Sequence, residues 1–201
     1  MRPVVLGALA LITALAGCGG QFETSYDAPL AAEVSQNWSL SEVVVNVPDA
    51  LTVSERNRFA PNADIVWHGD PEGNRRDQVA VIVEDGIRAG AASLQGSEPV
   101  VMSVTLERFH AVTPRAVASA PAAVHNISFA VQVFDASTGS ALTEPQRIQA
   151  DLEANVGSAA VVAAAEGQTQ KVRITNHIAR VTSGWLGQGA DVRRGFTSLG
   201  R

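Results

Sequence analysis

The sequence predicts an α+β domain: a mainly antiparallel sheet of about four to five strands, with two helices packed on one face. Two observations predict this class. Three segments in the second half of the chain alternate apolar and polar residues, and two longer segments repeat apolar residues at the helical period. The composition agrees, because 201 residues with 46% hydrophobic and 17% charged side chains suffice for one globular domain.

The first half of the chain predicts two short strands and one helix. The strands are the β-rich runs 43–47 and 65–67, each closed by a turn signal containing proline. Residues 74–95 show the helical period, with Gly86 and Gly90 one turn apart on the apolar stripe. Each glycine weakens a helix by roughly 1 kcal/mol relative to alanine. We therefore expect the helix backbone to approach the sheet closely at these two positions.

The second half predicts a three-stranded meander and a final helix. Apolar and polar side chains alternate in residues 100–107, 127–133 and 147–156, so one face of each strand is apolar and the other is expected to be exposed to solvent. The final helix is expected between 169 and 186, where Ile174, Ile178, Val181 and Trp185 recur at spacings of four, three and four. The long connection 110–123 is a candidate contact loop, because loops of this length in compact domains are often functional or disordered.

The remaining segments define the expected domain organisation. Residues 1–17 form a signal peptide, since Arg2 precedes an apolar run that is too short to span a bilayer. Residues 18–40 are polar and aperiodic, which predicts a lipidated N-terminus followed by a flexible tether. Residues 41–187 form the domain, and 188–201 are expected to be a mobile tail.

The residues Leu15-Ala16-Gly17-Cys18 resemble the lipobox of bacterial lipoproteins. The resemblance implies cleavage between Gly17 and Cys18 and attachment of three acyl chains to Cys18, which would anchor the protein stably in a membrane. Gly19 follows the cysteine where inner-membrane lipoproteins of enteric bacteria carry Asp, so the resemblance favours the outer membrane, facing the periplasm. Ordinary cleavage after Ala14-Leu15-Ala16 is the alternative and would release a soluble periplasmic protein. The position of the only cysteine favours the anchor.

Charge and motifs exclude several functions. A net charge of −5 argues against nucleic acid as a partner. The four histidines lack metal-ligand spacing and are expected at the surface or at strand ends, and no serine lies in a nucleophile motif. We therefore expect no catalytic residues, no metal and no other cofactor.

Two groups of residues remain as candidate contacts. Trp67, His68 and Asp70 form either a ligand clamp at a sheet end or, more simply, a strand end at which Asp70 caps a helix beginning at Pro71. The basic residues Lys171, Arg173 and Arg180 belong to the final helix. They form either a solvated helix face or a contact with anionic lipid.

Segments 67–70, 135–139 and 170–178 resemble those of a family of alphaproteobacterial lipoproteins without known activity. The element order is also similar to accessory lipoproteins of ABC transport systems and of the lipopolysaccharide-assembly translocon, which is a likeness of architecture alone. We expect a non-catalytic outer-membrane lipoprotein that binds an envelope protein as an accessory subunit. The alternatives are an envelope hydrolase using His68, Asp70 and a distant serine, and a soluble periplasmic carrier that holds an apolar ligand between helices and sheet.

Overall fold

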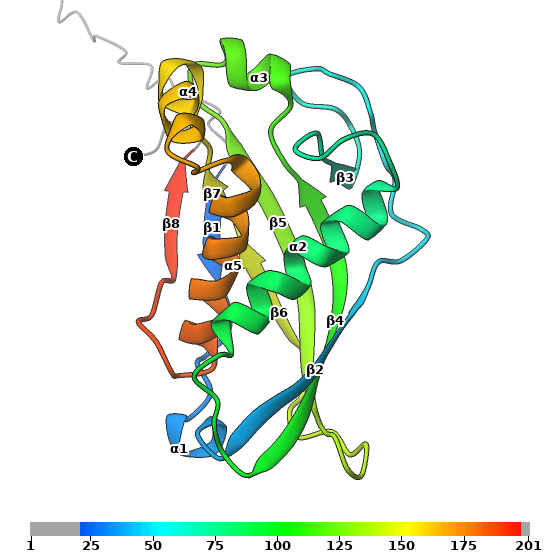
Figure 1. Ribbon diagram of the computed structural model, residues 1–201, viewed down its shortest axis with the longest axis vertical. Coiled ribbons are helices and arrows are strands. Elements are labelled where there is room, and N and C mark those ends of the chain that lie inside the picture. The colour runs from blue at the N-terminus through cyan, green and yellow to red at the C-terminus, as the bar shows by residue number, and fades with distance from the viewer. Residues whose placement is uncertain (1–20, 198–201) are drawn as a thin grey trace, which may run out of the picture.

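A computed structural model describes residues 21–197, which form an open sheet with helices α2 and α5 on one face (Figure 1). The strand order is β2-β4-β5-β6-β1-β8; in addition, β3 pairs with β4, and β7 pairs with β5. The strands are β1 (Gln21–Ser25), β2 (Trp38–Asn46), β3 (Ile65–Val66), β4 (Glu98–His110), β5 (Val124–Asp135), β6 (Gln146–Ala150), β7 (Leu152–Glu153) and β8 (Arg194–Thr197). The helices are α1 (Ala32–Ser35), α2 (Arg75–Gly90), α3 (Pro114–Ser119), α4 (Gly157–Ala165) and α5 (Gln170–Trp185).

The α+β class is confirmed, but the predicted numbers of strands and helices are too small. Within residues 21–197 the sheet has eight strands. Strands β2 and β3 run parallel to β4, whereas the other pairings are antiparallel. None of the helices in this part of the chain combines the length and apolar composition that crossing a bilayer requires.

The segments expected as tether and tail contain part of the sheet. Strand β1 lies between β6 and β8, with Thr24 opposite Ala150 and Phe22 opposite Phe196. The rings of Phe22 and Phe196 stack with their centroids 6.2 Å apart. Strands β1 and β8 are short, and they pair with segments more than 100 residues away in the chain, so a local sequence pattern does not reveal them. The expected signal peptide, Cys18, Gly19, Gly20 and the last four residues lie outside the described residues.

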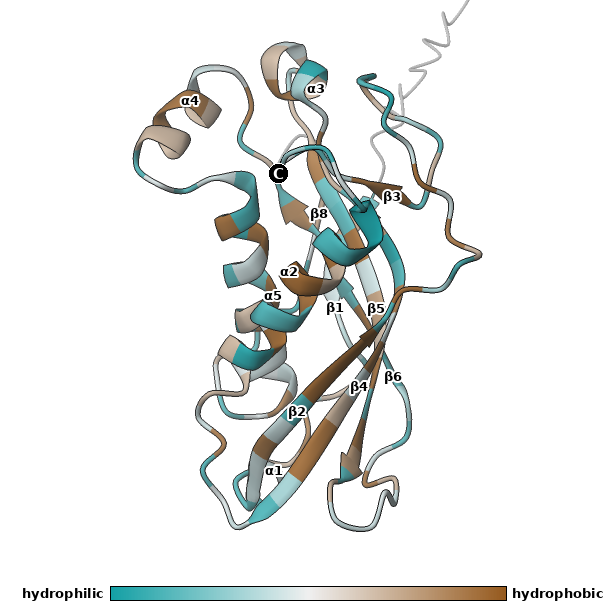
Figure 2. Ribbon diagram, turned by 45° about the vertical axis from the view of Figure 1, so that its right-hand side comes forward, coloured by the Kyte–Doolittle hydropathy of each residue, from teal (hydrophilic) through white to brown (hydrophobic). Residues whose placement is uncertain are grey.

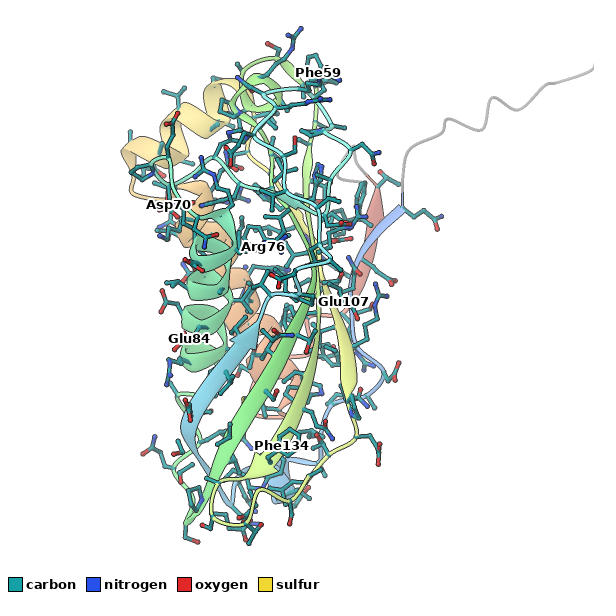
Figure 3. The ribbon with its side chains drawn as sticks, turned by 90° about the vertical axis from the view of Figure 1, so that its right-hand side faces the viewer. Phe59, Asp70, Arg76, Glu84, Glu107 and Phe134 are labelled. Carbon is teal, nitrogen blue, oxygen red and sulfur yellow. The ribbon has the colours of Figure 1, made fainter. Side chains whose placement is uncertain are left out.

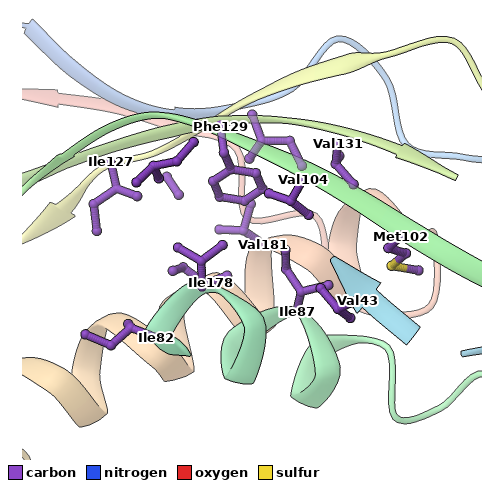
Figure 4. Close-up of a cluster of buried hydrophobic side chains, with 14 of the residues drawn as sticks. Val43, Ile82, Ile87, Met102, Val104, Ile127, Phe129, Val131, Ile178 and Val181 are labelled. Carbon is purple, nitrogen blue, oxygen red and sulfur yellow. The ribbon is translucent and has the colours of Figure 1, made fainter. Parts of the chain in front are cut away.

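The core fills the space between the sheet and the two helices (Figure 4). The apolar sides of β4 and β5 face α2 and α5, as the alternating pattern predicts. The side chains that meet there are fully or almost fully buried and include Met102, Val104, Phe129, Val131, Ile82, Ile87, Ile178 and Val181.

The close approach predicted for Gly86 and Gly90 is real, but it is made to helix α5 and not to the sheet. A Cβ atom on Gly86 would lie 2.7 Å from the Cβ of Ile178, and one on Gly90 would lie 2.4 Å from the carbonyl oxygen of Ala179. Both distances are below van der Waals contact. The missing side chains therefore let the two helices pack backbone against backbone.

We expect Gly90→Leu to lower the free energy of unfolding by about 1–3 kcal/mol, because the added side chain must push α2 away from α5. This range is the net change. The higher helix propensity of leucine compared with glycine, about 0.8–1 kcal/mol, offsets only part of the cost of the steric overlap. Urea unfolding of the Cys18→Ser protein measures the change.

Glu84→Gln is the control on the outer side of the same helix. It removes an exposed ion pair in which Arg88 Nη2 lies 2.8 Å from Glu84 Oε1, a contact worth about 0.3–0.5 kcal/mol. Equal losses for the two variants would mean that the helix–helix contact is wrongly placed.

Candidate functional site

Three of the residues singled out in the sequence meet at one end of the molecule: Trp67, Asp70 and Lys171. Trp67 Nε1 donates a hydrogen bond of 2.8 Å to Asp70 Oδ2, and Lys171 Nζ donates one of 2.9 Å to Asp70 Oδ1. Burial raises the pKa of Asp70, but the bonds from Lys171 and Trp67 outweigh it and hold the pKa below its ordinary value. The three side chains thus pin the first turn of α5 to the end of β3.

Asp70 does not cap α2, contrary to the expectation from the sequence. The helix begins at Arg75, and the side chain of Asn74 accepts the capping bond from the backbone N–H of Arg76 at 3.1 Å. Both carboxylate oxygens of Asp70 are already bonded to Trp67 and Lys171. Instead, Arg75 Nη1 donates to the carbonyl oxygens of Asp70 and Pro71, which fixes the loop from the helix side.

His68 lines an open polar cleft of about 650 Å³, together with Glu55 and Arg75. Arg75 and Glu55 form a two-point ion pair, with Nε–Oε1 at 2.8 Å and Nη2–Oε2 at 3.1 Å. Burial, together with the charge of Arg75, lowers the pKa of His68 although Glu55 opposes the shift.

His68 and Asp70 both line this cleft, but none of the described residues that line it is a serine. The oxygens of Asp70 accept bonds from Trp67 and Lys171, and no hydrogen bond joins Asp70 to His68 Nε2, which has no partner among the described residues. Among residues 21–197, no group of three His, Cys, Asp or Glu side chains could hold a metal ion.

Arg173 and Arg180 do not join this cluster. Arg180 is exposed on α5. Arg173 Nη2 donates to the carbonyl oxygen of Glu153 at 2.8 Å, whereas its Nη1 is buried and has no hydrogen-bond partner among the described residues. Arg173 and Lys171 line a groove of about 240 Å³ whose opposite wall is formed by alanines of α4.

Asp151 is the centre of a buried polar network that the sequence pattern does not reveal. The alternation predicts Asp151 on the solvent-exposed face of a strand. In the structure its side chain is only 2% exposed and lies at the break between β6 and β7. Its carboxylate accepts hydrogen bonds from the backbone N–H groups of Glu23 and Ile127, and from the amides of Asn126 and Gln149. Burial raises its pKa even though these bonds oppose the shift. The network fastens β1 to β5 and β6.

Two histidines expected at the surface or at strand ends are buried near this network. His125 is 0% exposed and accepts a bond from the Val112 N–H at 3.3 Å, and His177 lies 3.3 Å from Thr24 Oγ1. Burial lowers the pKa of His125 to about 3 and that of His177 to about 4, and neighbouring arginines add to both shifts. Their burial follows from tertiary packing beneath α5, since His177 lies on the inward stripe of that helix with Ile174 and Ile178.

The face of the sheet opposite α2 and α5 is hollowed beside β1. One hollow of about 680 Å³ is lined by Phe22, Asn126, Asp151 and Phe196, among others. A second, of about 650 Å³, shares Phe22 and Asn126 with it and extends under Phe59. We call the two together the outer groove. Its far wall is the connection 110–123, which contains α3, so this candidate contact loop does line a groove.

The outer groove was not predictable from periodicity, because Phe22 and Phe59 lie in segments without a regular apolar pattern. Phe59 is 52% exposed at one end of the molecule (Figure 3), and its ring lies 5.2 Å from the guanidinium carbon of Arg115. An exposed aromatic residue in a polar segment is the one local signal that points to this surface.

The comparisons with known proteins find a family but no function. The profile of a family of unknown function, DUF6778, matches residues 38–201. No curated protein matches the chain.

Among solved structures, the chain is similar to a DUF330 protein from Xanthomonas campestris, with 16% identity over 71% of this chain and 81% of that one and a TM-score of 0.40. A candidate lipoprotein from Caulobacter crescentus CB15 matches with 13% identity over 78% of this chain and 94% of that one, at a TM-score of 0.32. A PelC dodecamer from Paraburkholderia phytofirmans matches with 12% identity over 82% of this chain and 96% of that one, at a TM-score of 0.36. Likenesses at this level carry no functional information.

Proposed function

The chain belongs to DUF6778, a family of unknown function, and we propose its role from its own residues. We infer that it is a lipid-anchored protein of the outer membrane that faces the periplasm. It binds an envelope protein through the outer groove, as a non-catalytic accessory subunit of a transport or assembly system. The observation that carries the proposal is the short distance along the chain between the lipobox cysteine and the first strand of the sheet.

Only Gly19 and Gly20 separate Cys18 from Gln21, where β1 begins. Three extended Cα steps span roughly 10 Å. Strand β1 is held on both sides, by β6 and by β8, and Asp151 adds a bond to the backbone of Glu23. An anchor at Cys18 therefore holds the whole sheet against the bilayer surface, without the long tether that the sequence suggested.

The outer groove begins at Phe22, the second residue of β1, so the same anchor keeps it next to the membrane. It combines apolar side chains under Phe59 with the polar side chains around Asn126, which suits a segment of a protein that runs close to the bilayer. The carrier alternative is less well supported, because side chains fill the space between the helices and the sheet where its ligand would lie (Figure 4).

Affinity purification from gently solubilised membranes tests the proposal. The protein carries a C-terminal tag, and Cys18→Ser serves as the unanchored control. We expect the intact mass to correspond to a chain that begins at a triacylated Cys18, and a stoichiometric partner to be lost from the Cys18→Ser preparation.

A matched pair of variants tests the groove in the same experiment. Phe59→Ser is expected to lower recovery of the partner, whereas Leu142→Ser, which is comparably exposed at 42% and lies in the connection between β5 and β6, should leave it unchanged. Recovery of the protein alone in every form contradicts the accessory role. A hydrolytic activity that disappears in His68→Ala supports the enzyme alternative.

A further inference from the structure

Helix α4 exposes an apolar surface that a water-soluble domain normally buries. Its sequence GSAAVVAAA has no charged residue, and Ala163 is its only buried residue. Val161 is 71% exposed, more than any other large apolar side chain among the described residues, and Val162 is 56% exposed. Figure 2 shows the helix in pale to brown shades only. A helix that is apolar on all sides requires a cover other than water.

The exposed helix lies at the end of the molecule from which β1 starts. In Figure 1, β1 points away from the end that carries α3 and α4. Helix α3 contacts α4 and also lines the outer groove together with Phe22, so α3 joins the two regions. Because Cys18 is at most roughly 10 Å from Gln21, an acylated Cys18 brings this end of the domain to the bilayer.

The groove beside α4 matches the layered chemistry of a bilayer surface. Lys171 and Arg173 form its basic wall, and the buried Nη1 atom of Arg173 has no partner among the described residues. Val172, between them in the sequence, is 37% exposed. Apolar side chains beside basic ones are typical of helices that lie at the boundary between lipid headgroups and acyl chains. The positive charges of Lys171 and Arg173 favour the approach of anionic lipid phosphates to this groove.

We propose that α4 is a membrane seat: Val161 and Val162 enter the headgroup–acyl boundary of the same leaflet that holds Cys18. This inference rests on the proposed function, because it requires the lipid anchor. It adds a second attachment point, which fixes the orientation of the domain and aims the outer groove along the membrane surface.

Site-specific fluorescence on the full lipidated protein tests the seat. Cys18 is the only cysteine and its sulfur is acylated in the proposed mature form, so Val162→Cys introduces a single reactive thiol. Leu142→Cys, in the β5–β6 connection, is the control because its exposure of 42% is comparable and it lies at the other end of the sheet. Both are labelled with a polarity-sensitive maleimide and reconstituted into vesicles of phosphatidylethanolamine and phosphatidylglycerol.

We expect the emission of the label at position 162 to shift to the blue and to be quenched by brominated lipid. The label at position 142 should keep the emission wavelength of a label in water. If the protein floats with the vesicles but the emission of the label at position 162 does not shift, the seat is refuted while the proposed lipid anchor is supported. A blue shift that appears only after a partner protein is added means that the partner covers α4, which also refutes the seat. If intact mass shows no acyl chains on Cys18, the proposed anchor fails and the seat fails with it.

Discussion

Replacing Asp151 with alanine is expected to lower the free energy of unfolding by about 3 kcal/mol, a large effect for a single substitution. The carboxylate accepts bonds from two backbone N–H groups, those of Glu23 and Ile127, and from two side-chain amides. Alanine leaves these donors without an acceptor, at about 1–3 kcal/mol for each one that water does not reach. The desolvation cost of the carboxylate itself, seen in its raised pKa, partly offsets the loss.

Asp151→Asn is the matched control, because it keeps one acceptor oxygen in nearly the same volume. We expect it to cost less than the alanine variant, and urea unfolding of both in the Cys18→Ser background measures the difference. Hydrogen exchange should show that Asp151→Ala speeds exchange at Glu23 more than in the middle of β4. A loss below about 0.5 kcal/mol, typical of a surface position, would mean that Asp151 does not fasten β1 to the sheet.

Two buried histidines are expected to lower the stability by about 4 kcal/mol between pH 7 and pH 5, because they stay neutral in the folded state. Burial lowers the pKa of His125 to about 3 and that of His177 to about 4 from an ordinary value of 6.5. Below about pH 6.5 the unfolded chain binds protons that the folded chain does not, so each histidine contributes about 2 kcal/mol of this loss by pH 5.

The sign of the effect separates the histidines from Asp151. A lowered histidine pKa gives stability that is complete above about pH 6.5 and is lost as the pH falls toward the folded values. The raised pKa of Asp151 acts in the opposite direction, because its folded state binds a proton more readily than the unfolded chain.

Variants assign the pH dependence to these residues. His125→Gln and His177→Gln should each remove about half of the loss between pH 7 and pH 5, and the double variant should remove most of it. The comparison uses the change with pH, so a variant that is less stable at pH 7 remains informative. If the double variant keeps the full loss, other groups cause the acid sensitivity.

The elements with a long regular period could be predicted from the sequence. Strands β4 and β5 alternate over many residues, and the apolar stripe of α5 places Ile174, Ile178 and Trp185 in the core as expected. The short strands β1 and β8 could not be predicted, since four or five residues show no period and their stability comes from distant pairing partners. Strand β7 falls within the predicted strand 147–156, which the structure interrupts at Asp151. The glycines of α2 indicated a close contact, but nothing in a single helix tells whether a sheet or another helix makes it.

The candidate site was predictable only where neighbours in the sequence act together. Trp67 and Asp70 lie three residues apart and do bond to one another, and Lys171 joins them through the fold. Asp151 and His125 carry no local signal, and Phe59 has only its aromatic ring within a polar segment. Their surroundings are assembled from strands and loops up to 128 residues apart, as for the bond between Glu23 and Asp151.

Neutron reflectometry of the lipidated protein on a supported bilayer tests the central claim, that the domain lies directly on the membrane. We predict no water layer between the headgroups and the protein. A second protein carries about 15 Gly and Ser residues inserted between Gly20 and Gln21, together with Val161→Asp and Val162→Asp, which remove the seat on α4. This protein should show a water layer of up to about 20 Å between the headgroups and the domain. A water layer beneath the protein without the insertion would contradict the account, because it would show that the domain is held away from the membrane.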